Sequence, residues 1–225
     1  MASAADLPTK APAYAPAPSY NWTGFYAGVQ VGGGWDSNQV TVVNSTVHFP
    51  AGYSHTPSHG SGFLGGGYAG FNYQINRFVL GIDGDYSWAN LIGSESDVSP
   101  LTGVTNNDTE RVKWIATLTG RLGYAVDNWM FFCKGGAVWA GFDGNGIIPT
   151  VETNVSLTTR YGWTLGAGVE WGFTAHWSAK VEYDYANFGT SNYNRMTTSG
   201  TSPPIIPFSA TSSLNTVKLA LAYRF

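Results

Sequence analysis

Apolar and polar residues alternate with a period of two in eight stretches of this chain, and nearly all charged residues inside these stretches share one face. The last stretch is the clearest, because Leu219, Leu221 and Tyr223 occupy one face, whereas Lys218 and Arg224 occupy the other. Successive side chains of a β-strand point to opposite faces, so this strand has one side against an apolar medium. Lipid offers no partners to backbone N–H and C=O groups, and strands within it must therefore pair around a closed ring. The pattern predicts a transmembrane β-barrel with its charged side chains inside.

Composition excludes several other classes of protein. Only 11% of the 225 residues are charged, against about a quarter in soluble proteins. No stretch of about eighteen apolar residues exists, which excludes a transmembrane helix. The net charge of −3 provides no basic surface, so we expect no nucleic-acid partner. The single cysteine, Cys133, excludes an intramolecular disulfide and is typical of a small apolar strand residue.

The alternating stretches are long enough to cross a bilayer as tilted strands, and their connections alternate in length. The expected strands are 22–35, 62–74, 77–90, 111–125, 128–141, 159–174, 176–188 and 214–225. The connections at 75–76, 126–127 and 174–175 are tight turns, whereas 36–61, 91–110, 142–158 and 189–213 are long and polar. Outer-membrane barrels place short turns on the periplasmic rim. We therefore predict an all-β fold, an eight-stranded antiparallel up-and-down transmembrane β-barrel with short periplasmic turns and four long extracellular loops.

The charged faces of these strands predict what occupies the lumen. An eight-stranded barrel is just wide enough for its own side chains, and cations and anions inside it would neutralise one another. A register slip that moved an Arg or Lys to the bilayer midplane would cost roughly 2–4 kcal/mol, so the register is well specified. The expected lumen network comprises Asp83, Asp85, Arg111, Lys113, Arg121, Lys134, Arg160, Glu170, Lys180, Glu182, Asp184, Lys218 and Arg224.

The opposite faces carry the large apolar side chains, for example Val112, Trp114, Leu118 and Leu122 in the stretch 111–125. Aromatic residues gather near the strand ends, as they do at membrane interfaces. Toward the short turns these are Tyr73, Phe78, Tyr124, Trp129, Phe173, Trp177, Tyr223 and Phe225; toward the long loops they are Trp35, Phe63, Trp88, Trp114, Trp139 and Tyr161. A soluble lipocalin-like barrel would have the same period with the apolar face inside. The two aromatic belts, the alternating connections and the terminal Phe225 favour the membrane.

The first twenty residues differ from the rest. Met1 precedes Ala2-Ser3-Ala4-Ala5, a run similar to the small-residue end of a secretory signal. Residues 6–20 are rich in Pro and Ala, which predicts an extended, unpacked segment. The expected organisation is a signal remnant and periplasmic segment over 1–20, followed by an outer-membrane barrel over 21–225.

Three segments of the chain resemble one known family. They are Asn21-Trp22-Thr23-Gly24-Phe25-Tyr26-Ala27-Gly28, the run 65–74 beginning Gly65-Gly66-Gly67-Tyr68, and the run 162–183 beginning Gly162-Trp163-Thr164-Leu165-Gly166. The family is the small outer-membrane β-barrel family of alphaproteobacteria, whose members are called surface antigens, porin-family proteins or hemin-binding proteins. The resemblance covers about residues 21–225 and implies an eight-stranded barrel integral to a Gram-negative outer membrane. The closing Tyr223-Arg224-Phe225 resembles the aromatic signal read by the barrel-assembly machinery.

Ligand chemistry is sparse. The glycines at 65, 67 and 70 satisfy G-x-G-x-x-G, but a strand follows them where a dinucleotide site needs a helix. The first long loop holds His48, Tyr53, His55 and His59, whose side chains are able to ligate haem iron or a metal. Their spacing fits no compact metal motif, and ordinary loop residues remain the simpler interpretation.

The carboxylates of the strands are better explained by an ion network than by catalysis, because cations share their face. We expect no enzymatic activity and no cofactor, with haem as the alternative. The expected function is that of a structural and surface-interaction protein with a side-chain-filled lumen. The expected partners are outer-membrane lipid and lipopolysaccharide, the assembly machinery and an external ligand or host surface reached by the long loops. The alternatives are haem or metal capture by the first loop and a narrow porin-like channel for small solutes.

Overall fold

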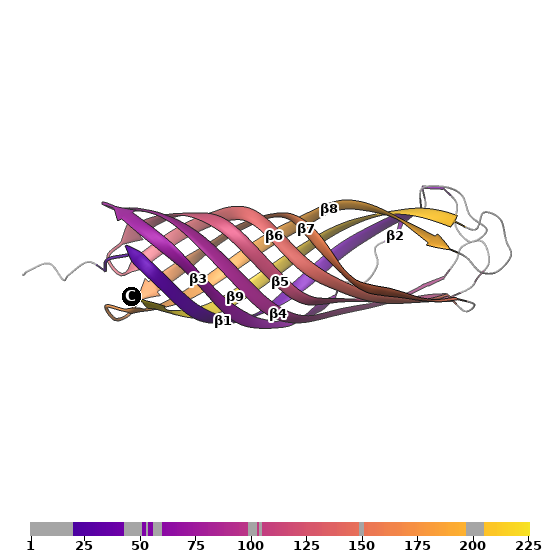
Figure 1. Cartoon of the computed structure of the whole chain (residues 1–225), viewed down its shortest axis with the longest axis horizontal. Coiled ribbons are helices and arrows are strands. Elements are labelled where there is room, and N and C mark those ends of the chain that lie inside the picture. Colours follow the sequence, from indigo (N-terminus) through magenta and orange to yellow (C-terminus); the bar gives the residue numbers. More distant parts are fainter. Residues whose placement is uncertain are drawn as a thin grey trace, which may run out of the picture.

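The computed structural model describes residues 20–42, 51–52, 54–55, 60–98, 103, 105–148, 151–196 and 205–225. Within them the chain forms one continuous antiparallel sheet that closes on itself (Figure 1). No helix among these residues is long and apolar enough to cross a membrane. The strands are β1 (Gly24–Val42), β2 (Ser54–His55), β3 (Ser61–Ile75), β4 (Phe78–Val98), β5 (Thr105–Val126), β6 (Trp129–Ile148), β7 (Val151–Gly172), β8 (Trp177–Met196) and β9 (Ile205–Arg224).

Eight long strands make the barrel, and the two-residue β2 is an addition to the edge of β1. Each long strand pairs with the next along the chain, and β1 also pairs with β9 from Tyr26↔Arg224 to Val42↔Phe208. That last ladder closes the cylinder. The eight-stranded antiparallel up-and-down barrel predicted from the alternation is confirmed.

Tight turns join the strands at the end of the barrel where the C-terminus lies (Figure 1). Asn76 and Asp127 adopt left-handed backbone conformations with φ of 55° and 52°. Asn and Asp tolerate this region better than other residues with a side chain, and it suits a two-residue hairpin. The turns comprise residues 76–77 and 127–128, each one residue farther along the chain than the sequence predicts.

The strands reach farther toward the long loops than the alternation indicates. β5 begins at Thr105 instead of residue 111, and β4 continues to Val98 instead of residue 90. A strand of 22 residues, as β5 is, rises about 55 Å along a barrel axis at the usual tilt, whereas an apolar band is only about 25 Å tall. The outer part of each strand needs no apolar face, so it lacks the signal by which strands were predicted.

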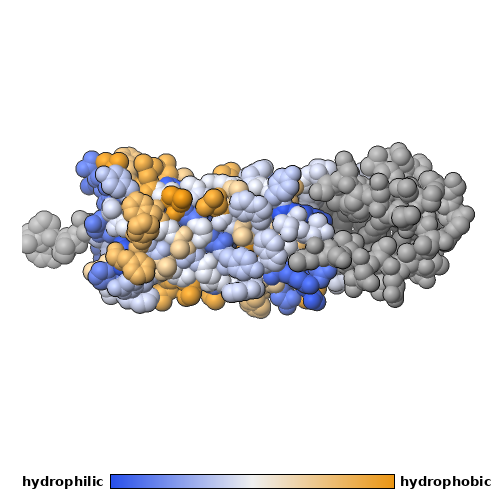
Figure 2. All heavy atoms as spheres, in the orientation of Figure 1, coloured by the Kyte–Doolittle hydropathy of each residue, from blue (hydrophilic) through white to orange (hydrophobic). Residues whose placement is uncertain are grey.

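The exterior wall is apolar between two aromatic belts. The short-turn belt includes Tyr73, Phe78 and Trp129, which are all exposed. The outer aromatic belt comprises Trp35, Phe63, Trp88, Trp114, Trp139 and Tyr161, and all of these except the half-buried Trp114 are exposed. Figure 2 shows apolar side chains gathered on the half of the barrel toward the short turns and hydrophilic side chains bordering the long-loop end. Only lipid suits such a wall, and the inside-out prediction holds over this band.

β5 departs from strict alternation, and two predicted lumen residues are misplaced by it. The ladder between β5 and β6 shifts register between Val112 and Trp114, so Lys113 is an extra residue. Beyond this β-bulge the faces exchange: Val112 is buried inside, whereas Arg111 and Lys113 are exposed on the outside. The prediction that Arg111 and Lys113 face the lumen and Val112 faces lipid is therefore wrong. A bulge inverts the parity of every residue on its far side.

The start of the barrel also differs from expectation. β1 begins at Gly24, and Tyr20 and Trp22 precede it without being in a strand. Both are buried, Trp22 completely, and their rings lie 4.5 Å apart. Burial raises the pKa of the Tyr20 hydroxyl, with the charge of Arg224 acting in the opposite direction. The prediction that residue 20 belongs to an unpacked segment is wrong, because this aromatic pair closes the short-turn end of the lumen.

We expect Leu118→Arg to lower the free energy of unfolding by roughly 2–4 kcal/mol, because it puts a cation into the apolar band between the belts. Leu118 is 52% exposed on the outer wall. The matched control is Thr109→Arg, on the exposed face of the same strand above the outer aromatic belt, which should change stability by less than about 0.5 kcal/mol. Urea unfolding of the barrel folded in phospholipid vesicles measures both. Equal effects of the two changes would contradict the assigned apolar band.

Candidate functional site: the lumen and its ion pairs

The lumen is filled in layers from one end to the other. At the short-turn end lies a cluster that we call the short-turn cap: Tyr20, Trp22, Val79, Ala125 and Met130. At the opposite end lies the outer apolar layer: Leu64, Leu91, Val112, Ile115, Val138, Ala140, Phe142, Ala186, Phe188 and Leu214. The buried charged residues lie between these two apolar layers, except Asp36, which stands opposite Leu214 in the ladder between β1 and β9 and so lies at the level of the outer apolar layer.

The cluster next to the short-turn cap is built around Glu170 of β7. Its carboxylate accepts hydrogen bonds from Arg121 of β5 and, at 2.6 Å, from the hydroxyl of Ser178 of β8. Arg224 of β9 lies 3.9 Å from the same carboxylate, and its guanidinium sits 4.8 Å from the ring centre of Trp22. We call Arg121, Glu170, Ser178 and Arg224 the arginine cluster. It ties four strands together across the lumen.

The second cluster contains three lysines and three carboxylates, and we call it the lysine cluster. Lys134 of β6 lies 2.6 Å from Glu182 and 3.4 Å from Asp184, both on β8. Lys218 of β9 lies 2.8 Å from Asp184 and 3.5 Å from Asp85 of β4. Every side chain of these four contacts is almost completely buried. The remaining member, Lys180, lies 2.8 Å from Glu182.

Polar residues that the sequence interpretation did not single out complete the interior. The hydroxyl of Tyr26 donates to Asp83 at 2.7 Å, and the amide of Gln30 donates to Ser87 at 2.9 Å. Tyr68 places its ring 4.1 Å from the ammonium of Lys180. Tyr26 and Gln30 share the inward parity of β1, but many glycines weaken the alternation in that stretch and hide the signal.

Gly28 provides the room that Tyr68 occupies. A Cβ at this position would lie 2.7 Å from the Tyr68 ring, closer than non-bonded carbon atoms approach. The narrow lumen thus accommodates a large ring on β3 because its neighbour on β1 has no side chain. Glycine at this strand position is explained by close packing.

Arg160 marks the outer end of the lumen. Its guanidinium lies 3.3 Å from Glu110 and donates to the hydroxyl of Ser212 at 2.6 Å. The same group lies over the ring of Phe142 at 4.3 Å, and Phe142 packs edge-on against Phe188. Glu110 lies just outside the strand predicted from alternation, which is why its pairing with Arg160 was missed.

Between the two apolar layers the buried charges balance. Asp83, Asp85, Glu170, Glu182 and Asp184 supply five anions, and Arg121, Lys134, Lys180, Lys218 and Arg224 supply five cations. A buried ion costs several kcal/mol unless a partner of opposite charge offsets its desolvation. Four of the carboxylates contact cations, and Asp83 accepts the bond from Tyr26. The arrangement is suited to neutralising charge within a narrow cylinder.

The other sequence-predicted residues lie elsewhere. His48, Tyr53 and His59 lie outside the described residues, and of His55 only the backbone is described, in β2 opposite Val40. Tyr223 and Phe225 lie on the outer wall at the short-turn end, with ring centres 5.3 Å apart. The glycines 65, 67 and 70 lie within β3, with no helix after them in the described chain. Among the described residues, no group of three or more His, Cys, Asp or Glu is placed to hold a metal ion.

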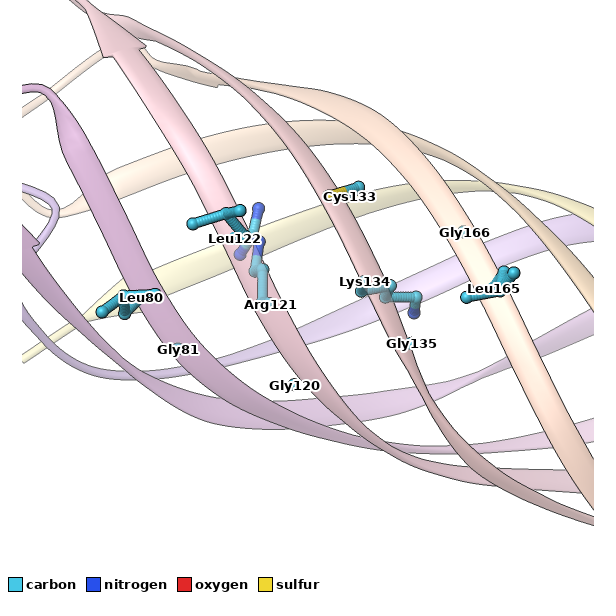
Figure 3. Close-up of a pocket in the computed structure, with 10 residues that line it drawn as sticks. All are labelled: Leu80, Gly81, Gly120, Arg121, Leu122, Cys133, Lys134, Gly135, Leu165 and Gly166. Carbon is cyan, nitrogen blue, oxygen red and sulfur yellow. The ribbon is translucent and has the colours of Figure 1, made fainter.

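The outer wall has shallow hollows between its leucines. One of about 610 Å³ is lined by Leu80, Leu122, Cys133 and Leu165, together with glycines that include Gly120 and Gly135 (Figure 3). Arg121 and Lys134 alternate with these residues along β5 and β6, and their charged ends are buried inside the barrel. The hollow therefore presents apolar surface to lipid.

Comparison with known proteins identifies relatives across most of the chain. A family model described as outer membrane protein beta-barrel domain matches residues 3–225. The 31 kDa outer-membrane immunogenic protein of Brucella melitensis is 30% identical over 231 residues, covering 96% of this chain and 88% of that protein. The 22 kDa outer membrane protein of Rhizobium leguminosarum bv. viciae is 27% identical, covering 92% and 80%. The crystal structure of the outer membrane protein OprG from Pseudomonas aeruginosa matches with a TM-score of 0.50 at 10% identity, over 92% of this chain and 98% of that one.

The arginine cluster predicts a strongly non-additive pair of substitutions. We expect Glu170→Gln to destabilise the barrel by about 3–5 kcal/mol, because it leaves Arg121 buried beside a neutral amide. Arg121→Met should cost a similar amount, whereas the double variant should cost clearly less than the sum of the two. Urea unfolding in vesicles measures all three. Additive losses would show that these side chains are not energetically coupled.

Proposed function

The chain belongs to the outer membrane protein β-barrel domain family, an outer-membrane family with immunogenic surface proteins among its members, and on that premise we propose that it is a structural and surface-interaction protein with a non-conducting lumen. The long-loop end would face the exterior and the short turns the periplasm. The alternating connection lengths support this orientation. The contacts offered to partners would then be made by the outer parts of the strands and by the long loops.

One observation carries this proposal: the lumen holds a balanced set of buried ions between two apolar layers. A water-filled path would have to pass the short-turn cap, both ionic clusters and the outer apolar layer. Opening such a path would separate ion pairs whose members are almost completely buried. We infer that the interior serves rigidity and leaves interaction to the outside.

No catalysis is part of the proposal. A general base needs a carboxylate or imidazole that is able to reach a substrate proton. The carboxylates of the two clusters are engaged by cations in the closed interior. The relatives support the same view, since they are named as immunogenic proteins of the outer membrane.

We expect the refolded full-length barrel to produce no regular conductance steps in planar bilayers, because side chains occupy its whole cross-section. A large porin inserted under the same conditions serves as the positive control for the membrane. Uniform steps from many independent insertions of this protein would favour the narrow channel instead. In cells, a deletion strain with increased detergent sensitivity and unchanged uptake of small solutes would support the structural role.

Haem or metal capture by the first long loop is the rival function, and it is independent of the lumen. It requires the refolded barrel to bind hemin, and it predicts that His48→Ala, His55→Ala and His59→Ala together abolish binding. Titration followed in the Soret absorption band measures this, with His176→Ala, at a short turn, as the matched control. Our proposal expects no saturable binding by the wild type, and saturable binding lost only in the triple variant would establish the rival.

A further inference from the structure

Two cations of β5 occupy the outer surface immediately above the outer aromatic belt. The bulge between Val112 and Trp114 turns Arg111 and Lys113 outward, and both side chains are exposed. Trp114 is the next residue toward the short turns, and it pairs across the ladder with Trp88. The two cations thus begin where the aromatic belt ends.

Among the side chains that the structure describes, those around these cations leave a net positive charge. Lys113 Nζ lies 2.5 Å from Asp143 of β6, and both side chains are partly exposed. Arg111 stands between Ile92 of β4 and Asp143 of β6 in the ladders, and it makes no ion pair with a described residue. Ile92 is itself 38% exposed, so the surface combines an apolar contact with two cations and one anion.

The depth of this surface in the membrane follows from the aromatic belt. Trp and Tyr rings lie at the level of lipid headgroups, between the hydrocarbon and the water. Arg111 and Lys113 are one to three residues beyond Trp114, which is roughly 3–8 Å along the barrel axis at about 3.3 Å per residue and the usual tilt. At this height the nearest anionic groups outside the protein are the phosphates of lipid headgroups.

The bulge has two effects, and both are consistent with a role for Arg111 and Lys113 on the outer surface. It places Val112 in the outer apolar layer, where its side chain joins the same cluster as Ile115 and Val138. It also places two cations on the same outer face two residues apart, so that both are able to reach one headgroup. An Arg guanidinium is suited to bidentate contact with phosphate, and a Lys adds a point charge.

We propose that Arg111 and Lys113 form a docking surface for the phosphates of lipid A, the membrane anchor of outer-leaflet lipopolysaccharide. Asp143 holds the Lys113 ammonium at the edge of this docking surface, and the Arg111 guanidinium binds the phosphate. Ile92 and Trp88 contact the adjoining acyl and sugar groups. The proposal rests on the orientation given under Proposed function, with the long-loop end outward.

The test compares two forms of lipid A with two forms of the protein. The refolded full-length barrel in a non-ionic detergent is titrated with bisphosphorylated lipid A or with dephosphorylated lipid A, and native mass spectrometry measures the bound fraction. We expect the double variant Arg111→Gln with Lys113→Gln to bind bisphosphorylated lipid A about tenfold more weakly than the wild type, as two exposed charge contacts are lost. Dephosphorylation should weaken binding to the wild type by a similar factor and leave binding to the variant nearly unchanged.

The controls separate this site from general attraction to lipid. Arg77→Gln removes an exposed cation at the short-turn end and should leave binding unchanged. Lys113→Arg keeps the charge and should retain most of the affinity. Far-UV circular dichroism confirms that each variant is folded before titration. Equal sensitivity of wild type and double variant to dephosphorylation would overturn the proposal, as would competition by phosphatidylglycerol at the same concentration as lipid A.

Orientation is tested separately, so that its failure is distinguished from failure of the lipid site. In a Cys133→Ser background, Ala51→Cys at the long-loop end should react with a membrane-impermeant maleimide on intact cells, and Asn128→Cys at a short turn should react only after lysis. The reverse labelling would refute the orientation and with it the assignment to lipid A. Correct labelling combined with phosphate-independent lipid binding would refute only the docking surface.

Discussion

The pairing of β1 with β9 is the contact on which the rest of this structure depends. The hydrocarbon offers no hydrogen-bond partners to the backbone. A sheet in lipid must therefore close on itself, so that every backbone N–H and C=O group finds its partner on a neighbouring strand. Closure with eight strands fixes a narrow cylinder, and its width then decides which side chains fit inside. Large rings such as Tyr68 and Tyr26 are admitted only where a neighbouring strand offers a glycine, as at Gly28. The many glycines of the chain follow in part from this geometry.

Closure also decides where charge must go. Lipid surrounds the wall, so an ionisable side chain within the apolar band has only the interior to occupy, and there it must meet an opposite charge. The arginine and lysine clusters answer that requirement with pairs that cross the lumen between strands distant in the sequence, such as Asp85 and Lys218. The pairs Arg121–Glu170, Lys134–Glu182 and Asp85–Lys218 join strands that share no ladder, and they add cross-bracing that the sheet itself lacks. The ion pairs of the interior are therefore a consequence of the apolar outer wall that lipid requires.

Much of the fold and of the lumen was predictable from the sequence, because the apolar band between the two aromatic belts requires a strict period of two. The fold, the turns and the inward position of residues such as Glu170 and Lys218 follow from that period alone. The partner of each buried residue does not follow from the period. Parity indicates which face of the strand a residue occupies, but it does not give the position of the residue along the barrel axis or the strand that lies opposite. Tyr20 and Trp22 precede the first strand, so their burial depends on packing that no periodicity reports. Residues of the outer strand extensions, such as Glu110, lie beyond the apolar band. Water surrounds the barrel there, so the outer face need not be apolar and the alternation is lost.

The register shifts explain why the alternation ends where it does. They lie between Trp88 and Leu91, Val112 and Trp114, Phe142 and Gly144, and Asn187 and Thr190, all at or beyond the outer aromatic belt. A bulge inside the apolar band would turn lumen charges toward lipid at roughly 2–4 kcal/mol for each cation near the midplane, whereas beyond the belt that cost falls toward zero. Irregularity is thus confined to the part of the barrel that lies outside the hydrocarbon. The first break in parity along a strand marks the limit of the hydrocarbon, and Arg111 and Lys113 are outward because they lie past that limit, at the level of the headgroups.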